Sequence, residues 1–297
     1  MRRATQRKVS EMKGIILAAG RGTRLYPMTR PVCKPLLPVY DKPLLYYPLS
    51  LLIQAGISDV MIIIPPGEEE TFSALLGDGS SYGMHINYAV QPVARGIADA
   101  LLIGADFIGD DSVCMVLGDN ILYENKLSEK MKRIAGANTG ATVFGYYVED
   151  PRPFGVIEFE ESGRAISIEE KPRHPKSNYI VPGIYFYDNQ VVEIARNLKP
   201  SARGELEITD VNLEYLRRGK LNVVPLDNKT SVWLDAGTAD SLLFAANTIR
   251  DIQDKLGRYV GCIEEQAFYE GWISQEEVHA LGQRLEKTLY GEYLMTL

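Results

Sequence analysis

The sequence predicts an α/β fold with a Rossmann-like, mostly parallel mixed sheet and helices on both faces. Short apolar runs rich in β-branched residues alternate with helical patterns in the N-terminal half, which is the order expected of β-α-β units. A glycine-rich turn ends the first run and an acidic motif ends a later one. Because ligands of such sheets bind beyond the carboxyl ends of the strands, we expect the two segments to share one crevice.

Apolar runs of strand length predict the strands of the N-terminal half, and apolar residues three or four apart predict its helices. The predicted strands are Gly14–Ala19, Asp59–Ile64, Ile86–Val90 and Val113–Leu117. The predicted helices are Leu44–Ala55, Phe72–Leu76 and Ala98–Phe107.

The middle of the chain is richer in β-branched and aromatic residues, and glycine and proline punctuate it, which favours short strands joined by turns. We expect strands at Ala141–Val148, Gly155–Phe159, Ala165–Glu169 and Ile180–Tyr187. Next we expect helices at Val191–Leu198 and Ile208–Arg218, then strands at Leu221–Pro225 and Ser231–Leu234. From Ala239 to the C-terminus the pattern is helical.

The composition argues against several classes of protein. A net charge of −7 is not typical of a general nucleic-acid binder, and no apolar run is long enough to span a membrane. The three cysteines (Cys33, Cys114 and Cys262) are widely spaced, which indicates reduced thiols and a cytoplasmic protein. The histidines lack the spacing of a zinc site. We interpret the basic residues 1–11 as a flexible tail.

The turn Gly20-Arg21-Gly22-Thr23 follows the first predicted strand. Such a turn lets backbone N–H groups approach an anion closely, and cations at Arg21, Arg24, Arg30 and Lys34 suit the charge of a nucleoside triphosphate. An ordinary tight turn would also explain the glycines. The pattern is not a P-loop, which needs a lysine after its last glycine, and Leu25 stands where a dinucleotide fingerprint has its third glycine.

Two acids follow predicted strands, Asp119 after Gly118 and Asp235 after Leu234. Two carboxylates that converge on a triphosphate supply the oxygen ligands that Mg²⁺ prefers. Either aspartate alone could instead be a turn former or a helix cap.

Several motifs occur in register from about Met12 to the C-terminus, and together they resemble the sugar-nucleotide pyrophosphorylases, most closely the thymidylyl-transferring members. The first is L-A-A-G-R-G-T-R-L-Y-P, followed by K-P-L-L-P. The others are D-K-P-L, Y-Y-P-L, L-G-D-G, L-G-D-N, E-E-K-P, P-K-S-N-Y and S-A-R-G-E-L-E-I-T-D. The resemblance implies a nucleotide-diphospho-sugar transferase fold with a catalytic domain over residues 12–246, which includes a β-rich sugar-binding part. It also implies a C-terminal helical segment over residues 247–297.

The resemblance also assigns roles to single residues. It implies nucleotide binding by Leu17, Ala19, Gly20, Gly22, Thr23, Arg24, Gln91 and Gly96. It implies sugar-phosphate binding by Gly155, Glu170, Lys171, Val181, Tyr185 and Arg203. Asp119 and Asp235 would hold Mg²⁺, and Arg24, Lys34, Lys171 and Asp119 would be the catalytic residues.

The chain departs from the family's usual motifs on the nucleotide side. Ala19, Pro35 and Asp99 stand where the family usually has glycine, glutamine and glutamine. A glutamine at position 91 suits the imide edge of thymine or uracil, since its amide both donates and accepts. These departures weaken the assignment of the base more than the assignment of the reaction.

The expected reaction transfers a nucleotidyl group from dTTP to α-D-glucose 1-phosphate and releases pyrophosphate. The same chemistry with UTP or another sugar phosphate is the first alternative. A nicotinamide dehydrogenase is disfavoured by Leu25, and a silent nucleotide-sugar sensor by the presence of all the cations and both acids. The resemblance implies a homotetramer with a regulatory nucleotide-sugar site between subunits. The alternative is that the apolar C-terminal segment packs only within its own chain.

Overall fold

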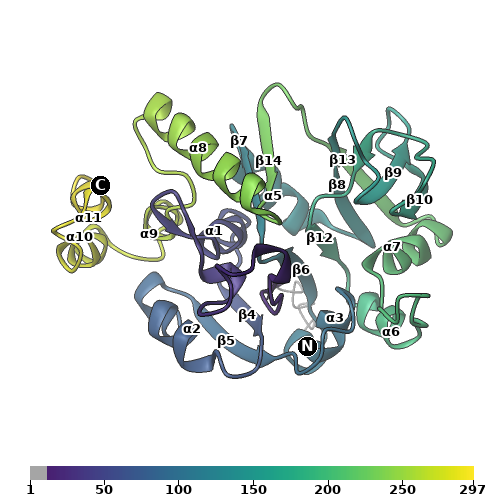
Figure 1. Ribbon diagram of the computed structural model, residues 1–297, viewed down its shortest axis with the longest axis horizontal. Helices are drawn as coiled ribbons and strands as arrows, with labels where there is room; N and C mark the ends of the chain where they lie inside the picture. The colour runs from purple at the N-terminus through teal and green to yellow at the C-terminus, as the bar shows by residue number, and fades with distance from the viewer. Residues whose placement is uncertain (1–11) are drawn as a thin grey trace, which may run out of the picture.

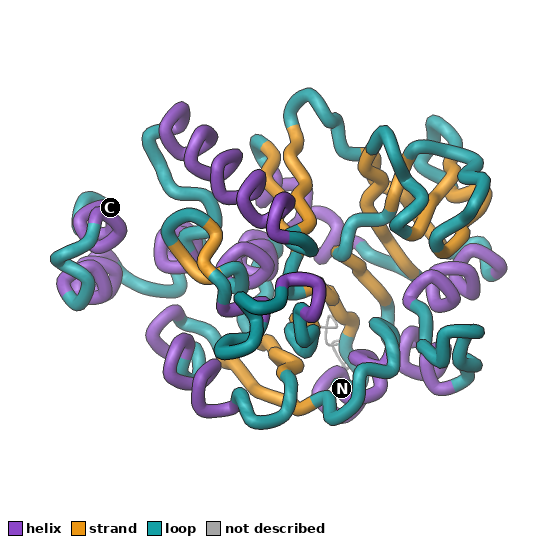
Figure 2. The backbone as a smooth tube through the Cα atoms, in the orientation of Figure 1, coloured by secondary structure: helices purple, strands orange, loops and turns teal. Residues whose placement is uncertain are grey.

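The structure is a computed structural model that describes residues 12–297, so the predicted tail of residues 1–11 lies outside the described part. A large mixed sheet runs through the molecule, and helices lie on both of its faces (Figure 1). Figure 2 shows the strands gathered between the helices. The predicted fold class is confirmed.

The main sheet has ten strands within residues 12–297. The bounds are β1 Met12–Leu17, β4 Asp59–Ile64, β5 His85–Val90, β6 Ser112–Leu117, β8 Ala141–Tyr147, β9 Gly155–Phe159, β10 Ala165–Glu170, β11 Tyr179–Ile180, β12 Ile184–Tyr187 and β13 Leu221–Pro225. The order is β10-β9-β11-β8-β12-β6-β1-β4-β5, with β13 beside β8. The strands β6, β1, β4 and β5 are parallel, whereas β12 is antiparallel to β6 and β8.

Helices on the two faces of the main sheet build two of the three hydrophobic cores of residues 12–297. The bounds are α1 Tyr46–Gln54, α2 Glu69–Leu76, α3 Asp99–Ile103, α4 Ala105–Ile108, α5 Leu127–Ala137, α6 Gln190–Arg196, α7 Ile208–Arg217, α8 Ala239–Leu256, α9 Ile263–Tyr269, α10 Gln275–Gln283 and α11 Leu289–Leu294. Successive residues of a strand point to opposite faces. Ile16 of β1 packs in the core with α1, α2 and α5, and Ile15 packs in the core with α3, α6 and α7.

Most predicted elements are present, and β4, β9 and β13 have the predicted bounds. The single strand predicted over Ile180–Tyr187 is wrong, because Pro182 has no N–H to give to the sheet and separates β11 from β12. The single helix predicted over Ala98–Phe107 is also wrong, since Gly104 separates α3 from α4. A Cβ at Gly104 would lie 2.6 Å from Ile15 Cδ1, so this close approach to the sheet requires glycine.

Three strands and one helix are absent from the sequence-based prediction. The strand β7 (Asn120–Glu124) pairs with β14 (Ser231–Asp235), and a short hairpin joins β2 (Pro38–Val39) to β3 (Lys42–Pro43). The helix α5 buries side chains at helical spacing, a signal that is present in the sequence.

The C-terminal helices pack on the rest of the chain. Cys262, Ile263 and Ala267 are fully buried in the core that also contains α1. The start of the C-terminal helical segment therefore packs within its own chain. The boundary expected between residues 246 and 247 lies within α8, and α10 and α11 extend to one end of the molecule (Figure 1).

A buried lysine joins the C-terminal helices to the β2–β3 hairpin. The Lys42 ammonium contacts the Asp41 carboxylate and donates to Gln253 Oε1 of α8 at 3.2 Å. It also lies 5.2 to 5.7 Å from the ring centres of Tyr47, Tyr259 and Tyr290. Desolvation lowers the pKa of Lys42, although Asp41 opposes the shift. The D-K-P-L motif therefore holds the C-terminal segment in place.

Glu264 gives a test of this buried polar region. Its carboxylate accepts a hydrogen bond from the Tyr290 hydroxyl at 2.5 Å, yet burial raises the pKa of Glu264. A carboxyl group with a raised folded pKa stabilises the fold at low pH, and the contribution is lost as pH rises through the folded pKa. Relative to wild type, Glu264→Gln should therefore gain stability as pH rises from about 4.5, by about 1.4 kcal/mol for each unit of pKa shift.

Denaturant unfolding of wild type and Glu264→Gln between pH 4.5 and 8 measures this difference. Glu161→Gln, at an exposed position, serves as the matched control. A stability difference that stays constant across this pH range would contradict the assignment.

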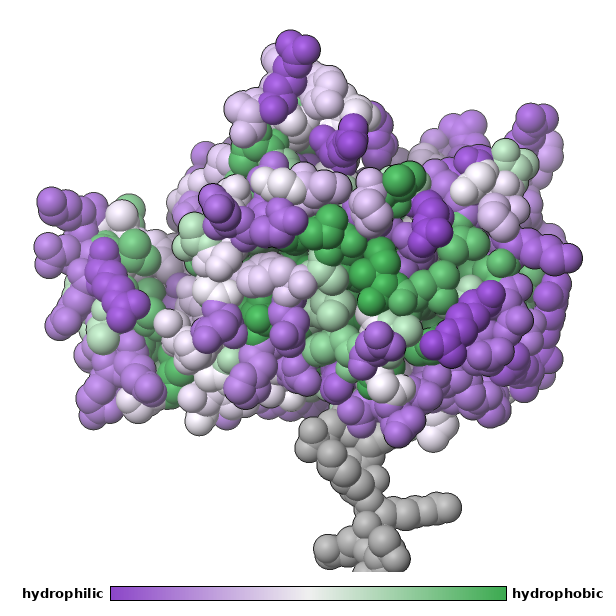
Figure 3. Space-filling view, turned by 90° about the horizontal axis from the view of Figure 1, so that it is seen from below, coloured by the Kyte–Doolittle hydropathy of each residue, from purple (hydrophilic) through white to green (hydrophobic). Residues whose placement is uncertain are grey.

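One edge of the main sheet is β5, where Tyr88, Ala89 and Val90 are only half buried. Figure 3 views the molecule from below Figure 1 and shows a hydrophobic band across the middle of that face.

Within residues 12–297, no helix is long and apolar enough to cross a membrane.

Candidate active site

A pocket of about 510 Å³ lies beyond the carboxyl ends of β6 and β14 and beside the loop that follows β1. The parallel pairing of β1 with β6 places Leu17 opposite Leu117, and the Gly118 N–H donates to the Leu17 carbonyl at 2.9 Å. The glycine loop and the acidic motif thus meet, as predicted. The pocket walls include these predicted residues: Arg24, Asp119, Gly155, Glu170, Lys171, Val181, Tyr185 and Asp235.

The remaining predicted residues are not among those that line this pocket. Leu17, Ala19, Gly20, Gly22 and Thr23 belong to the strand end and loop that lead to Arg24. Lys34 and Arg203 form ion pairs with pocket residues. Gln91 and Gly96 follow β5 and do not line the pocket.

The glycine loop has a backbone that only glycine fits well. Gly22 has φ +61°, and a Cβ there would lie 2.9 Å from Thr29 Cγ2 and 3.0 Å from Lys34 Cβ. The Thr29 hydroxyl donates to the Gly22 carbonyl at 2.6 Å. Leu25 is buried and anchors the short helical turn that carries Arg24 into the pocket.

Lys34 and Asp119 form the closest charge pair of the site. Lys34 Nζ lies 2.5 Å from Asp119 Oδ2, and the lysine is almost completely buried. Asn120 Nδ2 donates to Asp119 Oδ1 at 2.9 Å. Both oxygens of Asp119 are therefore oriented by side chains of the same chain.

Asp235 lies beside this pair. It ends β14 directly opposite Asn120 of β7, which brings its carboxylate near Asp119. Burial raises the pKa of Asp235, the charge of Asp119 raises it further, and Lys34 and Arg24 oppose the rise. Two acids are thus held together despite their repulsion.

This pair of carboxylates fits a divalent cation. Within residues 12–297, the acids, histidines and cysteines form no cluster of three or more that could hold a metal alone. Mg²⁺ commonly takes one or two carboxylates and completes its octahedron with phosphates and water. Asp119 and Asp235 supply that partial set, and a cation would offset their mutual repulsion.

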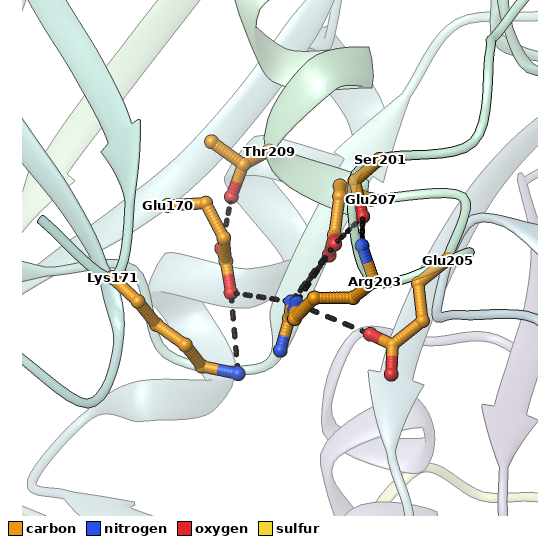
Figure 4. Close-up of polar contacts among 7 residues, drawn as sticks. All are labelled: Glu170, Lys171, Ser201, Arg203, Glu205, Glu207 and Thr209. Carbon is orange, nitrogen blue, oxygen red and sulfur yellow. Dashed lines mark hydrogen bonds and ion pairs between the residues drawn. The ribbon is translucent and has the colours of Figure 1, made fainter.

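Figure 4 shows a charged cluster in which Glu170 lies between Lys171, Arg203 and Thr209. Glu170 Oε2 accepts a hydrogen bond from the Thr209 hydroxyl at 2.6 Å. Its Oε1 lies 3.5 Å from Lys171 Nζ and 3.5 Å from Arg203 NH2. A Cβ at Gly155 would lie 3.1 Å from Thr209 Oγ1, so glycine leaves room for this contact.

Arg203 is fixed from its other side. Its NH2 donates to both oxygens of Glu207, at 2.8 and 2.9 Å, and it lies 3.3 Å from Glu205. Ser201 donates to the same Glu207 at 2.7 Å. These contacts with the two glutamates therefore fix the orientation of the Arg203 guanidinium.

Lys171 has a left-handed backbone, with φ +44°. Non-glycine residues rarely adopt this conformation, and it is often found at functional sites. Its N–H donates to the Phe154 carbonyl at 3.0 Å, and the half-exposed ammonium points toward Glu170 (Figure 4).

The predicted base-reading residues lie at the end of β5. Gln91 is buried, and its Nε2 donates to Asp99 Oδ2 at 2.9 Å. Gly96 has φ +103°, and a Cβ there would lie 2.4 Å from the Leu206 carbonyl oxygen. The segment around Gly96 therefore packs directly against the S-A-R-G-E-L-E-I-T-D segment.

Several residues that organise the pocket are not among the predicted site residues. Asn120 Oδ1 accepts from Trp233 Nε1 at 2.6 Å and from the Gly183 N–H at 3.2 Å. Asn120 directly follows Asp119, and Trp233 precedes Asp235 by two positions and so faces the same side of β14. The other missed pocket residues include Phe154, Thr209 and Asn212.

Comparisons with known proteins agree with this arrangement. The nucleotidyl transferase family model matches residues 13–252. A glucose-1-phosphate thymidylyltransferase of Neisseria meningitidis is 53% identical over 96% of this chain and 99% of its own length. The Mycolicibacterium smegmatis protein of the same name is 52% identical over the same shares.

Solved structures share the fold. A Bacillus anthracis structure, provisionally assigned as a glucose-1-phosphate thymidylyltransferase, is 44% identical with a TM-score of 0.74, over 81% of this chain and 96% of that one. A UDP-glucose pyrophosphorylase complexed with UDP-glucose has a TM-score of 0.71 at 23% identity, over 82% of this chain and 99% of that one.

Proposed function

The chain belongs to the nucleotidyl transferase family, and we propose that it transfers the thymidylyl group of dTTP to α-D-glucose 1-phosphate, giving dTDP-glucose and pyrophosphate. One observation carries the proposal. Asp119, Asp235, Glu170 and Lys171 line one pocket, and the cations of Lys34 and Arg203 pair with Asp119 and Glu170 at its border. The pocket can therefore hold two phosphorylated substrates against each other.

The reaction needs no protein nucleophile. A phosphate oxygen of the sugar attacks the α-phosphorus, the bond to the β-phosphate breaks, and pyrophosphate leaves. Arg24 and the N–H groups of the glycine loop would stabilise the leaving pyrophosphate. Lys34 and Lys171 would offset charge on the reacting phosphates, and Arg203 would orient the sugar phosphate. Alignment and charge stabilisation supply the catalysis.

Members of this family generally use a divalent metal ion, and Asp119 and Asp235 are the residues that would hold Mg²⁺. Bound there, Mg²⁺ would supply charge stabilisation to the phosphates. The side chains of Lys34 and Asn120 orient Asp119 for this role.

Pyrophosphate release across a panel of triphosphates and sugar 1-phosphates tests the function. We expect the highest kcat/KM with dTTP and glucose 1-phosphate, lower values with UTP, and little turnover of purine triphosphates. The UTP-dependent reaction is the second candidate, since the Gln91 side chain assigned to the base suits either imide base. Equal use of ATP or GTP would contradict the proposal.

The proposal includes a homotetramer in the cytoplasm. Reduced cysteines support the location, since Cys33, Cys114 and Cys262 are all free and buried. Exposed apolar side chains on the outer face of α8 support assembly: Leu243 and Phe244 are each 63% exposed. Apolar surface of this kind often marks an interface.

Phe244→Glu tests the assembly without exposing the buried C-terminal core. A buried charge at an interface is costly, so the variant should form smaller particles than wild type in light scattering. Ser162→Glu introduces the same charge at an exposed turn and should leave the assembly intact. A monomeric wild-type protein would contradict the tetramer, and an unchanged particle size in Phe244→Glu would exclude this face of α8.

A further inference from the structure

A buried carboxylate lies behind the glutamine that the proposed function assigns to the base. Asp99 Oδ2 accepts from Gln91 Nε2 at 2.9 Å, and Asp99 Oδ1 accepts from Arg95 NH2 at 2.7 Å. Asp99 is only 1% exposed, whereas the Arg95 side chain is 61% exposed. Both carboxylate oxygens are thus engaged, one by the glutamine and one by a surface cation.

Asp99 is a buried acid at the start of α3, where its carboxylate pairs with Arg95. Its neighbours in α3, Ala100 and Leu101, are fully buried in an apolar core. A charge in such a place costs free energy even when it is paired, and apolar residues of similar volume often replace it without loss. Besides pairing with Arg95, the carboxylate orients the Gln91 amide.

A carboxylate fixes the direction of an amide, because it only accepts hydrogen bonds. Gln91 has to turn its NH2 group toward Asp99, so its Oε1 points the other way as a fixed acceptor. A neutral partner that both donates and accepts would allow either direction. Asp99 therefore determines whether Gln91 presents its carbonyl oxygen, an acceptor, or its NH2 group, a donor, to the group on its other side.

The backbone around this pair is held as firmly as the side chains. The Gln91 N–H donates to the Ile64 carbonyl at 2.9 Å. The Leu206 N–H donates to the Arg95 carbonyl at 2.7 Å, and the Ala98 N–H donates to the Leu206 carbonyl at 3.1 Å. Gln91 and Asp99 thus both belong to backbone segments that these hydrogen bonds hold in place.

We propose that Asp99 is a positioning residue that sets the base specificity of this enzyme by fixing the Gln91 carbonyl as an acceptor. This inference rests on the proposed function. Thymine and uracil carry an N3–H donor between two carbonyl oxygens, whereas cytosine carries an unprotonated N3 beside an amino group. A fixed acceptor that faces N3 matches the imide N–H and opposes the lone pair of cytosine N3, and a site that mispairs buried polar groups rejects the wrong ligand strongly.

Asp99→Asn tests the proposal, because asparagine keeps the size of aspartate but can both donate and accept. We measure kcat/KM for dTTP and for dCTP with glucose 1-phosphate, by pyrophosphate release. The ratio of the two values should fall at least tenfold, while kcat at saturating dTTP stays within about threefold of wild type. Equilibrium binding of dTTP and dCTP, which does not depend on turnover, should show the same loss of discrimination.

Two further variants control the test. Asp106→Asn changes an exposed aspartate of the neighbouring α4 and should leave the ratio unchanged. If Asp99→Asn does not fold, Asp99→Ser replaces it, because a hydroxyl also donates and accepts. A structural role of Asp99 alone would lower the unfolding temperature and leave the ratio of dTTP to dCTP unchanged.

The outcomes separate this inference from the function on which it rests. A folded Asp99 variant that keeps the wild-type ratio overturns the inference and leaves thymidylyl transfer intact. A wild-type enzyme that uses dTTP and dCTP equally overturns the inference and leaves nucleotidyl transfer intact. A wild-type protein without pyrophosphate release on any pair of substrates overturns both.

Discussion

Replacing Asp119 by asparagine should lower kcat by about a hundredfold or more at saturating substrates. The substitution keeps the shape of the side chain but removes the charge that pairs with Lys34 and faces Asp235. A hundredfold loss corresponds to about 3 kcal/mol, which is the scale of one lost metal–ligand contact. The measurement is pyrophosphate release over a titration of Mg²⁺, in which the variant should also require more Mg²⁺.

Asp235→Asn should behave alike, and the double variant should lose little more than either single variant. Both carboxylates are assigned to one ion, and residues that act on one group do not have additive effects. Independent effects of the two substitutions would show that the two acids serve different purposes.

Asp111→Asn is the matched control for Asp119→Asn. Asp111 lies at the other end of β6, where its carboxylate is 3.6 Å from Lys13 Nζ. Its loss should leave kcat unchanged. If Asp119→Asn turned over at a near-normal rate with Mg²⁺, the metal assignment would be wrong.

Much of the fold follows from local patterns. The strands of the parallel part are buried on both sides, so they appear in the sequence as continuous apolar runs such as Val60–Ile64 and Val113–Leu117. Glycines 20 and 22 and the acids at strand ends could be located because strand ends and turns have local signatures. The residue roles came from the family resemblance.

The rest depends on contacts between residues far apart in the chain. Trp233 and Asn120 are 113 positions apart, and only the pairing of β14 with β7 brings their side chains to 2.6 Å. The sequence likewise shows Asp99 as a departure from a motif, but its role requires the buried contact with Gln91. Local periodicity also does not reveal that Pro182 interrupts a strand. After this interruption the Gly183 N–H donates to Asn120 Oδ1.

Replacing Lys34 by methionine should have the largest effect of any single substitution in the pocket. Lys34 is almost completely buried and lies 2.5 Å from Asp119 Oδ2. Methionine fills similar space but leaves Asp119 and Asp235 facing each other without the ammonium that offsets their repulsion. It also removes a positive charge assigned to the reacting phosphates.

We expect kcat/KM to fall by about a thousandfold, which equals about 4 kcal/mol. Removing one partner of a buried charge pair commonly costs 2 to 5 kcal/mol, so this size is reasonable. Because the two residues act as a pair, Lys34→Met combined with Asp119→Asn should lose much less than the product of the two single effects. Pyrophosphate release with the four proteins of this cycle gives the coupling free energy directly.

Lys13→Met is the matched control for Lys34→Met. Lys13 is also partly buried and also pairs with aspartates, at 3.6 Å from Asp111 and 3.9 Å from Asp59, but it lies at the opposite end of β1. Its loss should change the unfolding temperature and leave kcat/KM within about threefold of wild type. A folded Lys34→Met variant with activity in that same range would contradict the role of Lys34, because its charge would then be needed neither by Asp119 nor by the substrates.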